Sequence, residues 1–224
     1  MRINSQHHKF LLITVLLFTL FPFTIQAQIL IGGEVGGTLT NLTTPNNLAQ
    51  GVTWSYRFGF SAGVLLDLPI SGDIRIQPEI QYIQKGFNVD ASKVFPVGDW
   101  KVAVTNSYIE IPIYVKYSLG GNYVRWFLLG GPTIGYLLSS NSEVTDNPTI
   151  NGNRDTKNMY KSYDLTICVG VGLEYPLSSG YFLVPTLRYY NGVIKVDEPP
   201  AIDASSQSYS RTIQMTIGIV FPVL

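Results

Sequence analysis

After residue 27 the chain repeats one pattern eight times: strand-length segments in which bulky apolar residues alternate with small, polar or charged ones. In the second segment Phe58, Phe60 and Val64 share one parity, while Gly59 and Ser61 share the other. Because successive side chains of a β-strand point to opposite faces, this period-two alternation predicts strands that each carry one apolar face. The pattern therefore predicts an all-β fold with eight strands.

The connections between the segments alternate between short turns and long polar stretches. Consecutive strands joined in this way run antiparallel, so all short turns lie at one rim and all long loops at the other. The order predicts an eight-stranded antiparallel transmembrane up-and-down β-barrel with both chain ends at the short-turn rim. Short turns are expected at 69–73, 118–123 and 176–180, long loops at 41–54, 88–106, 139–161 and 196–208, and the glycine-rich first strand at 29–39.

Alternation alone does not say which face points outward, since a soluble barrel of the lipocalin kind buries its apolar face. Charged residues make up only 13% of this chain, about half of the roughly 25% typical of soluble proteins. Aromatic residues of the apolar parity also gather at the strand ends, as they do at the two interfaces of a membrane. We therefore expect the apolar faces to contact lipid. The predicted aromatic belts are Tyr117, Trp126, Tyr175 and Tyr181 near the short turns, and Phe58, Tyr82, Tyr136, Tyr163, Tyr189 and Tyr209 near the long loops.

The opposite parity carries charges of both signs, which we expect to line the lumen. Charges removed from water must be paired, and the interior of an eight-stranded barrel is filled by side chains. We therefore favour a salt-bridged plug over the alternative, a charge-selective channel. The predicted lumen charge network contains Arg57, Asp67, Arg75, Glu79, Glu110, Lys116, Arg125, Asp164, Glu174 and Arg188, and Lys85 shares their parity.

The N-terminus has the features of an export signal. Arg2 and Lys9 are basic, residues 10–23 are mostly apolar, and Ala27 is a small residue suited to cleavage. We expect a cleaved signal peptide at 1–27 and one outer-membrane β-barrel domain at 28–224, located in the outer membrane of a Gram-negative bacterium. The formal net charge is zero, so the chain has no basic surface that would favour nucleic acid.

Motifs for catalysis or cofactor binding are weak in this sequence. The only histidines, His7 and His8, fall in the predicted signal peptide, so the mature chain lacks the histidine base that barrel hydrolases and acyltransferases use. Cys168 has the lumen parity and is interpreted as a small interior residue. The glycines at 32–37 are not followed by a P-loop Lys-Ser/Thr and fit a barrel strand better. We predict no enzyme activity, no cofactor and no metal site.

Several short runs together resemble a known family. They are QPEIQYIQKG at 77–86, YIEIPIYVKY at 108–117, GGPTIGY at 130–136, GVGLEY at 170–175 and YYNG at 189–192. Their order and spacing are similar to those of the outer-membrane β-barrel domain family, which includes PorT-like proteins and is often labelled porin family. The resemblance implies a barrel of the OmpX/OmpA size, and association of some relatives with type IX secretion. The chain departs from the usual terminal aromatic residue, because Pro222, Val223 and Leu224 follow Phe221.

These observations predict a structural or surface-recognition role through the long extracellular loops, since exposed loops on a rigid scaffold commonly carry recognition. The alternative is an accessory component of a type IX-like secretion or envelope-assembly complex. The expected partners are outer-membrane lipid, the barrel-assembly machinery during biogenesis, and proteins of such a complex. Phe95 and Trp100 in one long loop are either contact residues or side chains that pack the loop on the rim, and the sequence does not favour one over the other.

Overall fold

A computed structural model describes residues 28–43, 52–93, 101–121, 123–145, 152–177, 180–196 and 209–223. The predicted signal peptide, Phe95 and Trp100 lie outside these residues. The elements are β1 (Leu30–Thr43), β2 (Thr53–Ser71), β3 (Ile74–Asp90), β4 (Lys101–Ser118), β5 (Arg125–Thr145), β6 (Gly152–Asp155), the 3-10 helix η1 (Lys157–Met159), β7 (Tyr163–Pro176), β8 (Phe182–Gly192) and β9 (Tyr209–Pro222). Within these ranges no helix has the length and apolar character needed to cross a bilayer.

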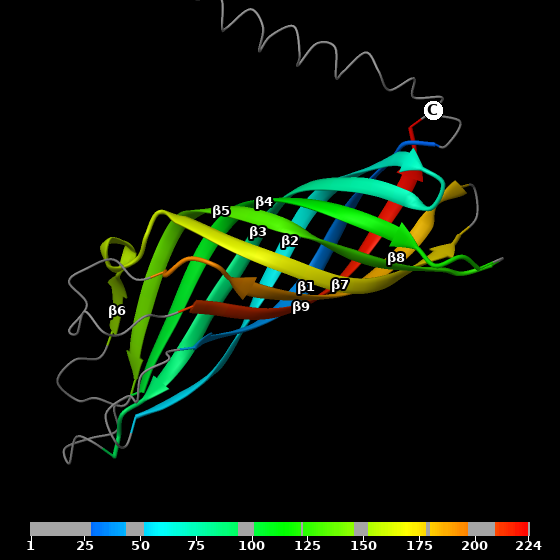
Figure 1. Cartoon of the computed structure of the whole chain (residues 1–224). Helices are drawn as coiled ribbons and strands as arrows, with labels where there is room; N and C mark the ends of the chain where they lie inside the picture. Colours follow the sequence, from blue (N-terminus) through cyan, green and yellow to red (C-terminus); the bar gives the residue numbers. More distant parts are fainter. Residues whose placement is uncertain are drawn as a thin grey trace, which may run out of the picture.

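Eight of the strands close into a ring, and Figure 1 shows the barrel from the side. Each strand pairs antiparallel with its neighbours in the order β1, β2, β3, β4, β5, β7, β8 and β9, and β9 pairs with β1 to complete the barrel. The β1–β9 ladder extends from Leu30 opposite Pro222 to Thr43 opposite Tyr209. The predicted eight-stranded antiparallel barrel is therefore confirmed.

The outward faces carry the bulky apolar residues that the alternation predicted. Along β9, Ile213, Met215, Ile217 and Ile219 are exposed, whereas the intervening Gln214 is fully buried. The same alternation holds over most of the ring, and Ile111, Ile113 and Val115 on β4 are among the exposed residues. Large apolar side chains in such numbers on an outer surface require lipid as their solvent.

The three short turns lie where the sequence predicted them. Gly72 and Asp73 connect β2 to β3, and Gly72 has a φ of 52°. This left-handed conformation favours glycine because a Cβ would crowd the following carbonyl. The connections β4–β5 and β7–β8 fall at 119–124 and 177–181.

The predicted long loops are partly wrong, because the strands continue beyond the expected ends. The β3–β4 ladder runs on from Gln84 opposite Ser107 to Asp90 opposite Lys101. On β5, residues 141–144 pair with β6, a short strand that the sequence did not predict. The apolar residues of these segments, such as Phe87 and Val104, point inward, whereas their outward residues, such as Asn88 and Thr105, are polar. The alternation expected at a lipid-facing surface therefore does not extend to them. Together, the loop-side ends of β2, β3, β4 and β5 with β6 form a wall that projects past the ring (Figure 1).

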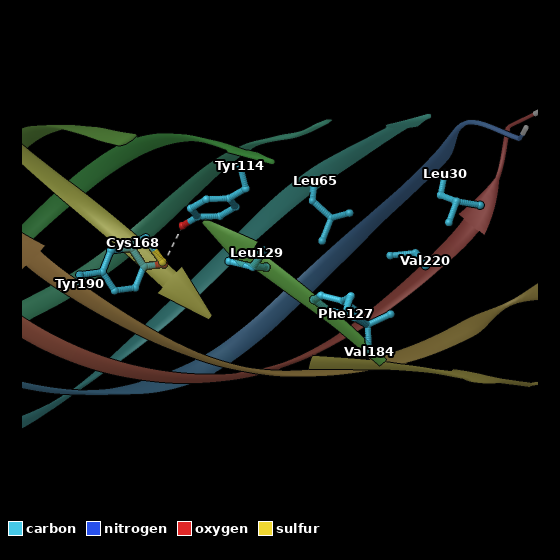
Figure 2. Packing of buried hydrophobic residues seen from close by; sticks show 9 residues of the cluster. All are labelled: Leu30, Leu65, Tyr114, Phe127, Leu129, Cys168, Val184, Tyr190 and Val220. Carbon is cyan, nitrogen blue, oxygen red and sulfur yellow. Dashed lines mark hydrogen bonds between the residues drawn. The ribbon is translucent and has the colours of Figure 1, made fainter. Parts of the chain in front are cut away.

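The barrel interior is less polar than the sequence predicted. Figure 2 shows an apolar cluster that runs inside the barrel from Tyr190, Cys168 and Tyr114 to Leu30 and Val220. These side chains have the same inward parity as the charged residues, and Cys168 among them was predicted to be an interior residue. A second apolar cluster lies at the loop side, where Leu42, Phe87, Val104 and Val196 are buried.

Candidate functional site: the charged barrel interior

Ionic groups gather at three heights inside the barrel. At the long-loop side Lys85 lies between two carboxylates, with its Nζ 2.6 Å from Glu110 Oε1 and 2.8 Å from Asp164 Oδ2. These side chains come from β3, β4 and β7, so the cluster ties three separate strands across the interior. The Lys85 ammonium also lies 5.4 Å from the centre of the Tyr108 ring, a cation–π distance.

At mid-height the Arg188 guanidinium binds two carboxylates at once. Its Nη1 lies 2.7 Å from Glu34 Oε1 and 3.0 Å from Glu79 Oε2, and its Nη2 donates to the other oxygen of each carboxylate at 2.9 Å. The planar fork of arginine suits this bidentate geometry. Arg188 is only 1% exposed, so a carboxylate partner is what makes its charge tolerable there.

Near the short turns a third cluster contains five charged side chains. Lys116 pairs with Asp67 at 2.7 Å and also with Glu174. Arg75 Nε lies 2.5 Å from Asp67 Oδ1, and Arg125 Nη2 lies 2.6 Å from Glu174 Oε2. Arg125 is partly exposed at the rim, whereas the two carboxylates are buried.

Hydrogen bonds between neutral side chains join the middle cluster to the loop-side cluster. Gln214 Nε2 donates to Ser61 Oγ at 2.8 Å and to Gln81 Oε1 at 2.9 Å, while Tyr190 Oη donates to Gln214 Oε1 at 2.7 Å. Gln81 Nε2 then donates to Glu110 Oε2 at 3.2 Å. Since Arg188 Nη1 also lies 3.5 Å from Gln214 Oε1, the middle and loop-side clusters belong to one hydrogen-bonded network.

The structure brings together nine of the ten predicted lumen charges, with Arg57 as the exception. Arg57 donates to Thr105 Oγ1 at 2.7 Å and to Asn88 Oδ1 at 3.2 Å. The strand neighbours of these two residues, Val104 and Phe87, belong to the buried apolar cluster at the loop side, so Thr105 and Asn88 have the outward parity. Arg57 therefore lies on the outer face. The β2–β3 register shift between Tyr56 and Ser61 adds a residue and reverses the parity there.

Glu34 is a buried charge that the sequence analysis missed. It is 6% exposed and completes the partners of Arg188. The glycines on both sides of it hid the alternation of β1. The available signal was its even spacing from Thr38 and Thr40, which are also buried.

The residues of the predicted aromatic belts lie on the outer face. Near the long loops the rings of Tyr136 and Tyr163 meet edge to face with their centres 5.4 Å apart. Near the short turns Tyr181 packs on Phe221 at 5.6 Å. Tyr82 is half-buried and donates to Ser107 Oγ at 2.9 Å. The exposed or partly exposed members are Phe58, Tyr82, Tyr117, Trp126, Tyr136, Tyr163, Tyr175, Tyr181, Tyr189 and Tyr209.

The thiol and the carboxylates of the interior are buried or paired. Cys168 is fully buried beside the Tyr114 and Tyr190 rings (Figure 2), which is typical of a structural thiol. The described part of the chain contains no group of three His, Cys, Asp or Glu side chains placed to hold a metal ion. Each interior carboxylate in the three clusters already has a basic partner.

The fold and the outward apolar face define the class: an eight-stranded transmembrane β-barrel. A family model for the outer membrane protein beta-barrel domain matches residues 22–198. The chain belongs to this family, whose members are outer-membrane proteins of Gram-negative bacteria. The PorT-like subgroup stays a prediction. A comparison with curated proteins gave no match.

A comparison with solved structures gives matches at low sequence identity. The outer membrane protein OprG from Pseudomonas aeruginosa is 10% identical, with 87% of this chain and 95% of that chain covered and a TM-score of 0.53. A major outer membrane protein from Thermus thermophilus is 13% identical, with coverages of 86% and 98% and a TM-score of 0.49. Neisserial surface protein A is 13% identical, with coverages of 86% and 96% and a TM-score of 0.48. At 10% identity the likeness to OprG concerns the fold alone.

Proposed function

We propose that this chain is a non-enzymatic integral outer-membrane protein whose lumen is plugged, and which acts as a structural or surface-recognition barrel through its long-loop side. The observation that carries the proposal is the three-level ion-pair network. Its Lys85, Arg188 and Lys116 side chains are each at most 4% exposed, so they fill the space that solutes would need. The buried apolar clusters between and above these levels support the same interpretation.

Single-channel recording in planar bilayers tests the plug. The wild-type barrel is expected to give no stable unitary openings, because water and ions have no continuous path past the paired side chains. The double variant Lys116→Ala, Arg188→Ala removes one long buried cation from the short-turn cluster and one from the middle cluster, and is expected to raise the frequency of openings. Large and stable openings in the wild type would contradict the proposal.

The recognition role is supported by the projecting wall. Beyond Tyr136, β5 continues for nine residues to Thr145, about 30 Å of extended chain. Its inward side is packed by the buried loop-side cluster, so the wall is a rigid platform for the long connections. Whole cells that display the wild-type barrel should differ in surface adhesion from cells whose segments 94–100 and 146–151 are replaced by Gly-Ser linkers.

The accessory role in a type IX-like secretion or envelope-assembly complex is the second candidate, favoured by one feature. Among the described residues β6 pairs only with β5, and its exposed outer edge offers unpaired backbone groups to a partner strand. Purification from native membranes in mild detergent separates the two roles. A lone, heat-modifiable monomer supports the first role, whereas a reproducible stoichiometric complex supports the second.

A further inference from the structure

An apolar groove follows β1 along the outer face of the barrel. It has a segment of about 940 Å³ toward the long loops and one of about 610 Å³ toward the short turns. The two segments share Val35, Ala62 and Ile217 in their walls, and the exposed Val35 side chain lies between them. The walls facing it are almost entirely apolar.

Outward-facing glycines on β1 create the groove. Gly37 is paired between Phe60 on β2 and Met215 on β9, so a position without a side chain lies between two large ones. Phe60 and Met215 are 51% and 66% exposed and form raised walls. Gly33, four residues before Gly37 on β1, has the same arrangement, since it is paired between Val64 on β2 and Ile219 on β9.

The loop-side segment of the groove fits within one leaflet. It extends from Leu39 to Val35 on β1, which is about 14 Å of strand and, at a strand tilt of about 40°, about 11 Å of depth. Half of a hydrocarbon core of about 30 Å is somewhat thicker than this depth. A single acyl chain entering from the long-loop interface would therefore lie along this segment without leaving its own leaflet.

A cation lies at the interfacial end of the same segment. Arg211 follows Tyr209 on the outer face of β9 and precedes Ile213, which lines the groove. Arg211 is exposed, and its register neighbours are Asn41 on β1 and Asn191 on β8. Two amides and a guanidinium thus stand where the apolar surface ends, at the height at which lipid headgroups meet a barrel.

We propose that this groove binds one acyl chain of an anionic, phosphate-bearing lipid from the long-loop leaflet, and that Arg211 contacts the phosphate of that lipid. The apolar walls select a hydrocarbon chain, and the arginine selects a negative headgroup. The lipid is held at a fixed position beside the β1–β9 junction, where the first and last strands close the ring.

Native mass spectrometry of the full-length barrel in detergent tests the headgroup part. The probes are dioleoyl phosphatidylglycerol, which is anionic, and dioleoyl phosphatidylethanolamine, which is zwitterionic. The wild type should bind the first phosphatidylglycerol about fivefold more tightly, since one interfacial arginine near an anionic lipid contributes ~1 kcal/mol. Arg211→Gln should remove this preference, and the control Arg154→Gln, on exposed β6 away from the groove, should keep it.

Filling the groove tests the acyl-chain part. Ala62→Phe adds a ring between the walls and should weaken the first binding event for both lipids by at least fivefold. The control Val115→Phe makes a similar change on the outer face of β4, far from the groove, and should leave binding unchanged. If Ala62→Phe fails to fold, Gly37→Leu serves instead, because the nearest atoms to its new Cβ belong to the Phe58 ring, which is exposed and able to rotate.

Three results would overturn the proposal. Equal affinity of the wild type for the two lipids would remove the role of Arg211. Unchanged lipid binding in the groove-filling variants would place the lipid elsewhere. A dimer mass in the wild type that these variants abolish would instead make a second copy of the chain the occupant of the groove.

Discussion

Replacing Arg188 by methionine should destabilise the barrel strongly. Methionine keeps much of the length and apolar volume of the side chain but removes the charge that Glu34 and Glu79 share. Both carboxylates are at most 6% exposed, so water does not replace the lost partner. Breaking a buried pair by removing one member costs about 3–5 kcal/mol. That is a large part of a typical total stability of about 5–15 kcal/mol.

The charge-free triple variant Arg188→Met, Glu34→Gln, Glu79→Gln is the informative comparison. Replacing a whole buried ionic group by neutral residues is often nearly neutral, so the triple variant should recover most of the loss. Arg125→Met is a matched control, because Arg125 pairs with Glu174 at the rim and its side chain is 42% exposed. Because Arg125 is partly solvated and the buried Glu174 keeps Lys116 as a partner, this loss should cost less than about 1 kcal/mol.

Equilibrium urea unfolding in lipid vesicles, followed by tryptophan fluorescence, measures these differences, and the heat-modifiability of the band on a gel confirms folding. The reasoning would be refuted if Arg188→Met lost less than about 1 kcal/mol. It would also be refuted if the triple variant were less stable than the single one. Either result would mean that the Arg188 charge does not need its two carboxylates.

Three further changes have defined outcomes. Gly72→Ala should lower the unfolding free energy by about 1 kcal/mol because Gly72 is left-handed, and Gly72→Asn should lose less in the same unfolding assay. Gly86→Ala should slow assembly into vesicles and cost about 1–3 kcal/mol, since its Cβ would overlap the Val104 carbonyl oxygen; equal folding yield would count against this close contact. Cys168 should resist maleimide in the folded barrel and react after unfolding, and rapid labelling of the folded state would show that the interior admits solutes.

The sequence predicts the ring well because lipid imposes a strict rule on it. Ile76, Ile111 and Ile217 must alternate with smaller or polar residues wherever the outer surface meets hydrocarbon. The projecting wall was not predicted because both faces of residues 141–144 contact water or neighbouring side chains. Bulky apolar residues therefore need not alternate with polar ones in this segment. The β6 sequence Gly-Asn-Arg-Asp also has low strand propensity, and pairing with β5 makes it a strand.

The sequence predicts some of the interior charges correctly, but not all of them and not their partners. The alternation along the strand correctly predicts that Arg188 and Glu79 point inward, because β8 and β3 are regular at these positions. The alternation wrongly predicts that Arg57 points inward, because a single sequence does not reveal the bulge in β2. Glu34 was not predicted as an interior charge because glycines near it obscure the alternation of β1. The pairing of Lys85 with both Glu110 and Asp164 depends on the stagger of β3, β4 and β7, which a single sequence does not contain.

The central claim is that bulky residues contact acyl chains while the interior is closed and paired. Site-directed spin labelling along β9 tests it most directly, on a Cys168→Ala background in lipid vesicles. Nitroxides at Ile213→Cys, Met215→Cys and Ile217→Cys should be accessible to oxygen, which concentrates in lipid, and one at Thr216→Cys should be shielded from both oxygen and a water-soluble nickel relaxant. The account would be contradicted if the label at Thr216→Cys were accessible to oxygen and those at the isoleucine and methionine positions were shielded. Free access of the nickel complex to the label at Thr216→Cys would also contradict it.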